Sequence, residues 1–319
     1  MRALITGGAG FIGSHLADVL LARGDHVIVL DNLSTGRHEN IAHLLGRTDF
    51  EFVLGSVLNV DLVDDVVSRS DTVFHLAAAV GVELIVQKPL ESLATNIRGS
   101  EVVFEKAHKY GTRILVTSTS EIYGKNTSDR LGEEDDRILG SPLKSRWSYS
   151  EAKAIDEILA YTYWREKGLE SVIVRLFNTV GPRQTGTYGM VVPRFVRQAV
   201  LGEPLSVYGD GSQTRCFCFV GDVVQALVDL VEHPEAYGRV FNIGATGEIS
   251  MAGLAEKVIE IVGSHSKIRY VPYEEAYEEG FEDMARRVPD TTRANQLIGF
   301  EPTVGLDDII AMVAEEQRR

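Results

Sequence analysis

The chain has 319 residues with 44% hydrophobic and 24% charged residues, the composition of an ordinary globular protein. Lys and Arg number 32 against 46 Asp and Glu, and a formal net charge of −14 argues against a nucleic-acid binder, which needs a basic face to replace phosphate counterions. No apolar run reaches the roughly 18–20 residues of a membrane span, and the N-terminus lacks a signal-peptide pattern, so we expect a cytoplasmic protein without membrane contact.

Short apolar strands alternate with helical stretches through the first half of the chain. Segments rich in Val, Ile and Leu with little alternation are typical of strands buried on both faces, and helices between them imply crossover connections. The pattern predicts an α/β fold with a doubly wound parallel sheet. The strands are expected at Arg2–Thr6, His26–Leu30, Phe50–Leu54, Thr72–Leu76, Arg113–Thr117 and Ser171–Leu176.

Three helices are expected between these strands. Amphipathic segments cover Ser14–Arg23 and Ala94–Tyr110, and a longer helix runs from about Ser150 to Lys167, where Gly168 closes it.

The amino-acid composition of the chain changes after Asn178. Gly- and Pro-rich turns separate short apolar segments at Val191–Val200, Val223–Glu232, Val240–Ile243 and Met251–Val262. We expect a first domain at 1–178, with returning segments from about 215–245, and a smaller lobe at 179–319 that packs with it as one unit.

A glycine-rich turn follows the first strand and opens the first helix. In GGAGFIG, Gly7 suits a tight turn, Gly10 lets the backbone approach a pyrophosphate, and Gly13 lets the helix pack close to the strand. About 20 residues on, Asp31 ends the second strand, where a carboxylate accepts the ribose hydroxyls of NAD and repels a 2′-phosphate. The sequence predicts NAD as cofactor, while the nearby Arg37 keeps NADP open as the alternative.

A second set of residues has the composition of a proton-transfer site. Tyr149 and Lys153 have the spacing Y-x-x-x-K at the start of a helix, which places both side chains on one face. A nearby ammonium lowers the pKa of a phenol and lets it exchange a proton with a substrate hydroxyl. Thr119 follows the fifth strand, at the edge where parallel sheets bind ligands. The motif alone is also common on surface helices, so the interpretation depends on the other motifs.

The two cysteines, Cys216 and Cys218, are one residue apart. That spacing disfavours a structural disulfide, and no second Cys/His pair completes a zinc site, so we expect packing residues and no metal.

Taken together, these motifs resemble the extended short-chain dehydrogenase/reductase family, the nucleotide-sugar epimerases, dehydratases and decarboxylases. The resemblance covers essentially the whole chain and implies a Rossmann-type domain that retains NAD, a lobe that binds a nucleoside diphosphate sugar, and a homodimer built on helices Ala94–Tyr110 and Ser150–Lys167. The motifs are GGAGFIG, Asp31-Asn32, His75-Leu76-Ala77-Ala78, Asn96, TSTSEIYG, YSEAK and Asn178-Thr179-Val180-Gly181-Pro182-Arg183.

The resemblance assigns roles residue by residue. Tyr149 is the expected base, Lys153 the ligand of the cofactor ribose, and Thr119 the hydroxyl partner. Ser56 stands where many relatives have an Asp that contacts adenine. The expected cofactor-binding residues are Gly7, Gly10, Phe11, Ile12, Gly13, Asp31, Asn32, Ser56, Leu76, Ala77, Ala78, Asn96, Thr117, Tyr149, Lys153 and Val180.

The sequence specifies the oxidation at the sugar C4 more sharply than the reaction that follows it. Glu121 beside Thr119, and Arg146 three residues before Tyr149, resemble the UDP-glucuronate decarboxylases, and a C4 ketone assists loss of a C6 carboxylate. Epimerisation of a UDP-hexose or UDP-hexuronate at C4 requires only Thr119, Tyr149, Lys153 and NAD, and it stays open. A 4,6-dehydratase is the third alternative.

The UDP-sugar is expected to lie in the second lobe, against arginines that suit bidentate pairing with phosphate. The resemblance suggests that Arg215 and Arg287 contact the pyrophosphate or the nucleotide ribose. The expected substrate-binding residues are Ser120, Arg146, Asn178, Arg183, Val192, Arg194, Arg215 and Arg287.

Overall fold

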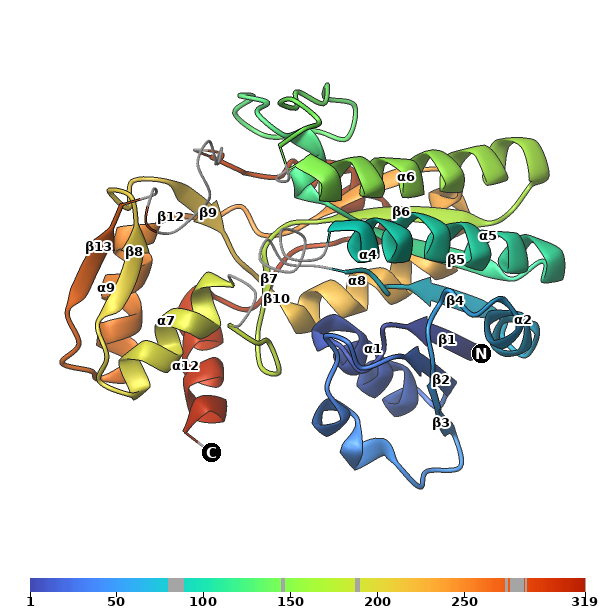
Figure 1. Ribbon diagram of the computed structural model, residues 1–319, viewed down its shortest axis with the longest axis horizontal. Helices are drawn as coiled ribbons and strands as arrows, with labels where there is room; N and C mark the ends of the chain where they lie inside the picture. The colour runs from blue at the N-terminus through green and yellow to red at the C-terminus, as the bar shows by residue number, and fades with distance from the viewer. Residues whose placement is uncertain are drawn as a thin grey trace.

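The computed structural model describes residues 1–79, 89–144, 147–186, 190–272, 275, 284 and 286–318. Its centre is a parallel sheet of seven strands in the order β11-β6-β5-β4-β1-β2-β3 (Figure 1). Chain order reverses beside β1, as in a doubly wound sheet, so ligands are expected there, at the carboxyl ends of the strands. The strands are β1 (Arg2–Thr6), β2 (His26–Asp31), β3 (Phe50–Leu54), β4 (Thr72–His75), β5 (Arg113–Thr119), β6 (Ser171–Leu176) and β11 (Val240–Ile243).

Helices cover both faces of this sheet. One face carries α1 (Phe11–Ala22) and α8 (Val220–Glu232), and the other carries α2 (Val60–Ser68), α5 (Gly99–Tyr110) and α6 (Ser148–Lys167). The α/β fold expected from the alternating strands and helices is therefore confirmed.

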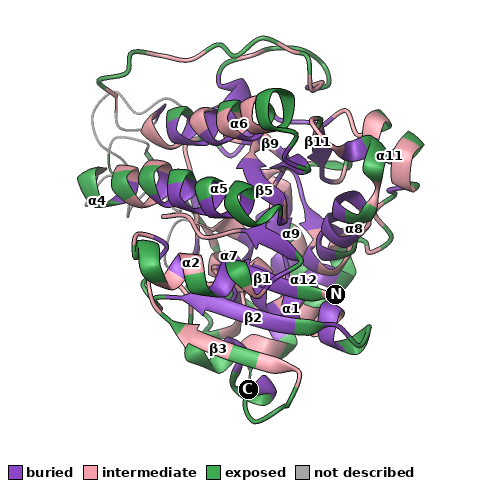
Figure 2. Cartoon of the chain, turned by 90° about the vertical axis from the view of Figure 1, so that its right-hand side faces the viewer, coloured by how far each residue is buried: buried purple, intermediate pink, exposed green. Residues whose placement is uncertain are grey.

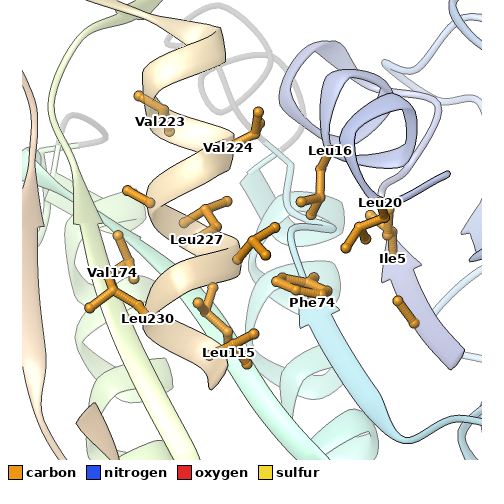
Figure 3. Close-up of a cluster of buried hydrophobic side chains, with 14 of the residues drawn as sticks. Ile5, Leu16, Leu20, Phe74, Leu115, Val174, Val223, Val224, Leu227 and Leu230 are labelled. Atoms are coloured by element: carbon orange, nitrogen blue, oxygen red, sulfur yellow. The ribbon is translucent and has the colours of Figure 1, made fainter. Parts of the chain in front are cut away.

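Neighbouring residues of one strand enter the cores on opposite faces. Ile5 packs with α1 and α8, while Leu4 packs with α2 and α5, because successive side chains of a strand point to opposite faces. Figure 3 shows the first core, where Leu227 of α8 and Leu16 of α1 lie over Phe74 of β4. This double burial explains the unbroken apolar runs in the sequence (Figure 2).

A smaller lobe lies beside the carboxyl ends of the strands (Figure 1). It has its own apolar core among α7 (Val191–Val200), α9 (Met251–Val262) and α12 (Leu306–Gln317). Its strands form three short pairs. These are β8 (Leu205–Tyr208) with β13 (Ile268–Val271), β9 (Thr214–Cys216) with β12 (Glu248–Ser250), and β7 (Thr179–Val180) with β10 (Cys218–Phe219).

The helix expected over Ala94–Tyr110 is interrupted. The short α4 (Pro89–Leu93) leads into one π-helical turn at Ala94–Arg98, and α5 begins only at Gly99. Single π-turns inside helices are frequent at functional sites. This turn contains Asn96, whose side chain accepts from the Ala79 N–H at 2.7 Å and donates to the Ala79 carbonyl at 3.2 Å. Asn96 therefore holds the segment that leaves β4.

Within the described residues, no helix has both the length and the apolar character to cross a membrane. Cys216 and Cys218 are both buried free thiols, and burial raises the pKa of Cys216 to about 11.

Candidate active site

One cavity of about 530 Å³ lies between the sheet and the smaller lobe. It extends from the turn after β1 to the lobe residues Tyr208 and Met251, so one cavity connects the sheet edge with the lobe. All four expected catalytic residues line it, namely Thr119, Glu121, Tyr149 and Lys153.

Most of the expected binding residues line the same cavity. Of the expected cofactor-binding residues, all but Asn96 are among the described residues that line the cavity. The Asn96 amide instead accepts the Ala79 N–H. On the substrate side Ser120, Asn178, Arg183, Val192, Arg194, Arg215 and Arg287 line it. Arg146 lies outside the described residues.

The turn after β1 leaves no room for side chains. Gly7 has φ +74°, and a Cβ there would lie 2.9 Å from the Ala77 backbone; a Cβ on Gly13 would lie 2.6 Å from the Gly8 Cα. Residues Gly10 to Gly13 line the cavity where α1 begins, and no side chain caps that helix end. Free N–H groups and the positive end of a helix dipole favour an anion, so this end of the cavity fits a pyrophosphate.

Asp31 closes the far end of this cradle. Its carboxylate is buried and accepts hydrogen bonds from the Ala9 N–H at 2.9 Å and the Leu33 N–H at 2.8 Å. Burial raises the pKa of Asp31 against the effect of these two hydrogen bonds. An acceptor held in this way suits ribose hydroxyls and disfavours a phosphate, which fits NAD.

The residues expected to be catalytic meet where β5 ends. Thr119 is the last residue of β5, and its Oγ1 accepts the Glu121 N–H at 3.2 Å, which caps the short 3₁₀ turn Ser120–Tyr123. Ser150 of α6 donates to the Glu121 carbonyl at 3.0 Å, which fastens this turn to the helix that carries Tyr149. The sequence places these residues in two motifs, and the fold brings the motifs together.

The electrostatics of Tyr149 differ in part from expectation. Lys153 lowers the pKa of Tyr149 as the spacing predicts, but burial outweighs it and raises that pKa above the ordinary value. The phenol is therefore neutral until a substrate or cofactor adds positive charge or a hydrogen bond.

Arg287 lies beside Glu121, one of the residues expected to be catalytic. Its guanidinium forms an ion pair with the Glu121 carboxylate and donates to the Ser120 hydroxyl at 3.3 Å. Arg287 is buried, so a strong pair with Glu121 compensates a charge held away from water.

The other arginines have different neighbours. The backbone N–H of Arg183 donates to both carboxylate oxygens of Glu316 on α12 at 2.8 Å. The Arg183 guanidinium pairs with Asp18 on α1 at 2.7 Å. Arg183 therefore connects the cofactor side to the smaller lobe.

Arg194 covers an aromatic ring in the lobe. Its guanidinium lies 4.2 Å from the centroid of the Tyr208 ring and donates to the Ser206 carbonyl at 3.2 Å. Sequence reasoning missed Tyr208, since one tyrosine on a short strand carries no local signal.

Two further expected residues support the backbone of the site. Asn178 donates its amide to the Cys216 carbonyl at 2.8 Å, and Thr117 donates its hydroxyl to the His75 carbonyl at 3.3 Å.

Among the described residues, no group of His, Cys, Asp and Glu side chains is arranged to hold a metal ion. The chemistry within reach is proton transfer at Tyr149, with charge supplied by Lys153, Glu121 and Arg287.

A dinucleotide cradle joined to a Tyr/Lys pair at the carboxyl edge of a parallel sheet defines a dinucleotide-dependent α/β enzyme. A model of the NAD dependent epimerase/dehydratase family matches residues 3–244. The chain belongs to this family. The description of the family agrees with the predicted cofactor, NAD.

The relatives of this chain include sugar-nucleotide decarboxylases. It is 41% identical to the UDP-N-acetyl-alpha-D-glucosaminuronate decarboxylase of Bacillus cytotoxicus, over 95% of this chain and 93% of that protein. It is 39% identical to UDP-glucuronic acid decarboxylase 4 of Arabidopsis thaliana, over 100% of this chain and 69% of that protein.

Among solved structures, the UDP-glucose 4-epimerase of Thermotoga maritima with UDP-glucose superimposes with a TM-score of 0.90. The two sequences are 33% identical, and the match covers 100% of this chain and 99% of that one.

Proposed function

We propose that this enzyme decarboxylates a UDP-hexuronate through a 4-keto sugar, with NAD retained in the cavity. The observation that carries the proposal is the Glu121–Arg287 pair on the turn after Thr119, in the cavity that Tyr149 and Lys153 also line. A guanidinium at this point suits a substrate carboxylate. Two relatives of the chain are named for decarboxylation of such sugars.

NAD, when bound, accepts the hydride from the sugar C4 and returns one later. The residues that would hold it are those of the cradle at Gly7–Gly13, Asp31 for a ribose, and Lys153 for the ribose beside the reacting ring. Ser56, Val180 and the Leu76–Ala78 segment line the cavity around this path.

The protein residues move protons around the sugar. Tyr149 takes the proton of the C4 hydroxyl, and Thr119 holds the same oxygen by a hydrogen bond. The resulting C4 ketone is β to the C6 carboxylate. The C5–C6 bond therefore breaks, its electron pair moves to the ketone oxygen, and CO2 leaves.

Glu121 and Arg287 act at the far side of the ring. Arg287 orients the C6 carboxylate before the C5–C6 bond breaks. After CO2 has left, C5 takes up a proton that comes from solvent water, and Glu121 is the group that we assign to relay it.

The nucleotide end of the substrate belongs in the smaller lobe. Arg194 and Tyr208 form a flat surface beside Val192 that suits a base, and Arg215 is buried in the same cavity, where it suits the diphosphate. The division into a cofactor part (1–178, with about 215–245) and a substrate lobe follows from this assignment.

Epimerisation at C4 is the second candidate. The structural similarity to a 4-epimerase favours this reaction. Of the protein's side chains, epimerisation needs only Thr119, Tyr149 and Lys153. Epimerisation does not use the Glu121–Arg287 pair, so we rank decarboxylation first.

The product identifies the reaction. The enzyme is incubated separately with UDP-glucuronate, UDP-N-acetylglucosaminuronate and UDP-glucose, and products are followed by mass spectrometry and proton NMR. Loss of CO2 from a uronate supports the proposal. Unchanged mass with inverted C4 establishes the epimerase instead, and loss of water establishes a dehydratase.

Two variants connect the reaction to the residues. Tyr149→Phe should abolish turnover of every sugar nucleotide, because the C4 proton then has no acceptor. Glu121→Gln should slow decarboxylation at least about 100-fold, the loss typical for a positioned acid. The exposed Glu166→Gln on α6 is the matched control.

We propose that the enzyme is a homodimer formed through α5 and α6, which lie side by side (Figure 2). Ile158 and Tyr161 expose large apolar side chains on α6, at 63% and 43%. Ile158→Glu should convert the dimer to a monomer in light scattering. We place the enzyme in the cytoplasm, where the thiols of Cys216 and Cys218 remain reduced.

A further inference from the structure

Behind the cavity, Lys153 forms an ion pair that the sugar chemistry does not require. Its ammonium lies 3.0 Å from the Asp156 carboxylate, one helical turn further along α6. The side chains are 2% and 0% exposed, and Asp156 is not among the described residues that line the cavity. Asp156 therefore acts on the site through Lys153.

A row of polar groups continues from Asp156 into the sheet. Burial raises the pKa of Asp156, while the charge of Lys153 and then the Ser100 hydroxyl of α5 lower it. The His75 ring of β4 lies 3.0 Å from the Ser100 Oγ through Nε2 and 2.8 Å from the Thr6 Oγ1 through Nδ1. Since the Ser100 hydroxyl donates its proton to the Asn96 carbonyl at 2.7 Å, Ser100 accepts from Nε2–H, and Nδ1 accepts from the Thr6 hydroxyl.

His75 adds no charge to this row. Burial, followed by the charge of Lys153, lowers the pKa of His75 to about 3. The ring is therefore neutral at physiological pH and serves as a hydrogen-bonding link.

A lysine enclosed in this way needs a counterion. Burial by itself lowers the pKa of Lys153, but the charges of Asp156, Tyr149 and Glu157 outweigh burial and raise it. The ionisable groups that face Lys153 or Tyr149 come from three parts of the fold. Asp156, Tyr149 and Glu157 belong to α6. His75 belongs to β4, and Glu121 follows β5. Within the described chain, Lys153 is the only cation in an ion pair with Asp156.

We propose that Asp156 is a positioning residue that keeps Lys153 protonated and fixed beside Tyr149. The proposal deepens the proposed function, since it concerns the same Tyr/Lys pair. Lys153 tunes Tyr149 only while it carries its charge, and a dry site removes that charge from an unpaired ammonium. Asp156 lies three positions after Lys153, where the helix brings its carboxylate to the ammonium without exposing it to the substrate.

Asp156→Asn removes the charge with almost no change of shape. Lys153 then loses its proton at lower pH, so we expect the alkaline limb of the kcat profile to move down by at least one pH unit. The Asp156 charge also raises the pKa of Tyr149 directly, but by less than the Lys153 charge lowers it, so loss of the Lys153 charge moves the ionisation of the Tyr149 phenol to higher pH. Asp156→Glu should recover part of both shifts.

The second readout does not depend on turnover. Phenolate absorbance near 295 nm is titrated in the NAD-loaded protein and in Asp156→Asn, each measured against the same protein carrying Tyr149→Phe. The subtraction isolates one of the 11 tyrosines. Glu166→Gln, an exposed carboxylate on the same helix, should titrate like the wild type.

Three results would overturn the inference. These are an unchanged Tyr149 titration in Asp156→Asn, a titration displaced to lower pH, and a kcat profile that keeps its alkaline limb. If Asp156→Asn fails to fold, Ser100→Ala should move both readouts in the same direction by a smaller amount, and unchanged readouts would contradict the proposal. Failure of the proposed function is distinct, because it appears as turnover in Tyr149→Phe whatever the titration shows.

Discussion

Arg287 and Glu121 are 166 positions apart in the sequence and form an ion pair at the end of β5. Both side chains are largely buried, at 9% and 16% exposure. The pair places a guanidinium against the carboxylate on the turn after Thr119, so the proposed substrate carboxylate would share Arg287 with Glu121.

Loss of Arg287 should affect both stability and catalysis. Arg287→Gln removes the charge that pairs with the Glu121 carboxylate, and we expect the free energy of unfolding to fall by about 3–5 kcal/mol, the range for a broken buried pair. The kcat/KM for a UDP-uronate should fall at least about 100-fold. Urea unfolding and steady-state kinetics measure the two effects.

The neighbouring Arg286 provides the control for this prediction. It pairs with Glu248 at 2.6 Å on the surface, so Arg286→Gln should leave the unfolding curve and kcat/KM nearly unchanged. Equal effects of the two substitutions would contradict a special role for the buried pair.

The protonation of His75 predicts how stability depends on pH. Its pKa is about 3 in the folded protein against an ordinary value of 6.5, so the unfolded chain binds the proton first as pH falls. The stability associated with a neutral His75 is therefore complete above about pH 6.5 and is lost progressively toward pH 3. Between pH 7 and pH 5 this loss is about 2 kcal/mol.

His75→Gln isolates that contribution. The amide does not titrate in this range, so the difference in unfolding free energy between wild type and variant should narrow by about 2 kcal/mol from pH 7 to pH 5. Urea unfolding across this range tests it. Parallel stability curves for the two proteins would show that His75 does not carry the effect.

The cradle predicts a steric effect on cofactor retention. Gly13→Ala places a Cβ 2.6 Å from the Gly8 Cα and pushes α1 away from the turn. We expect the Kd for NAD, measured by calorimetry, to rise at least about tenfold, a change of about 1.4 kcal/mol. Gly247→Ala is the control, because a Cβ there meets nothing within 4 Å. If Gly13→Ala binds NAD as tightly as the wild type, the glycine-rich turn is not part of the cofactor site.

The contact between Arg183 and Glu316 predicts a selective effect on substrate binding. Glu316→Ala leaves the Arg183 N–H without its acceptor and loosens the turn before α7. We expect KM for the sugar nucleotide to rise about tenfold with kcat retained, since the turn lies at the cavity and not at the reacting atoms. Glu315→Ala on the same helix should behave like the wild type. A fall in kcat alone would contradict this assignment.

The strands and the two motifs of the site could be read from the sequence because each depends on near neighbours. Arg2–Thr6 and Ser171–Leu176 match β1 and β6 to the residue, since continuous apolar runs reflect burial on both faces. The end of β5 could not be read in this way. It continues to Thr119 because Thr119 pairs with Leu176 of β6, a partner far along the chain.

Asp156 was within reach of sequence reasoning and was missed. Three positions after Lys153 is a contact distance on a helix, but that spacing equally fits an exposed surface pair. Only the packing of α5, β5 and β6 against α6 makes the pair a buried one.

By itself the sequence determined the α/β class, the glycine cradle with Asp31, and the Tyr149–Lys153 face, because backbone freedom and helical spacing act over a few residues. The tertiary structure decided which charges meet: Arg287 with Glu121, and Arg183 with both Asp18 and Glu316. Those partners depend on how the late segments of the chain return to the sheet edge. Burial then strengthens the Arg287–Glu121 pair, since little water is left to screen its charges.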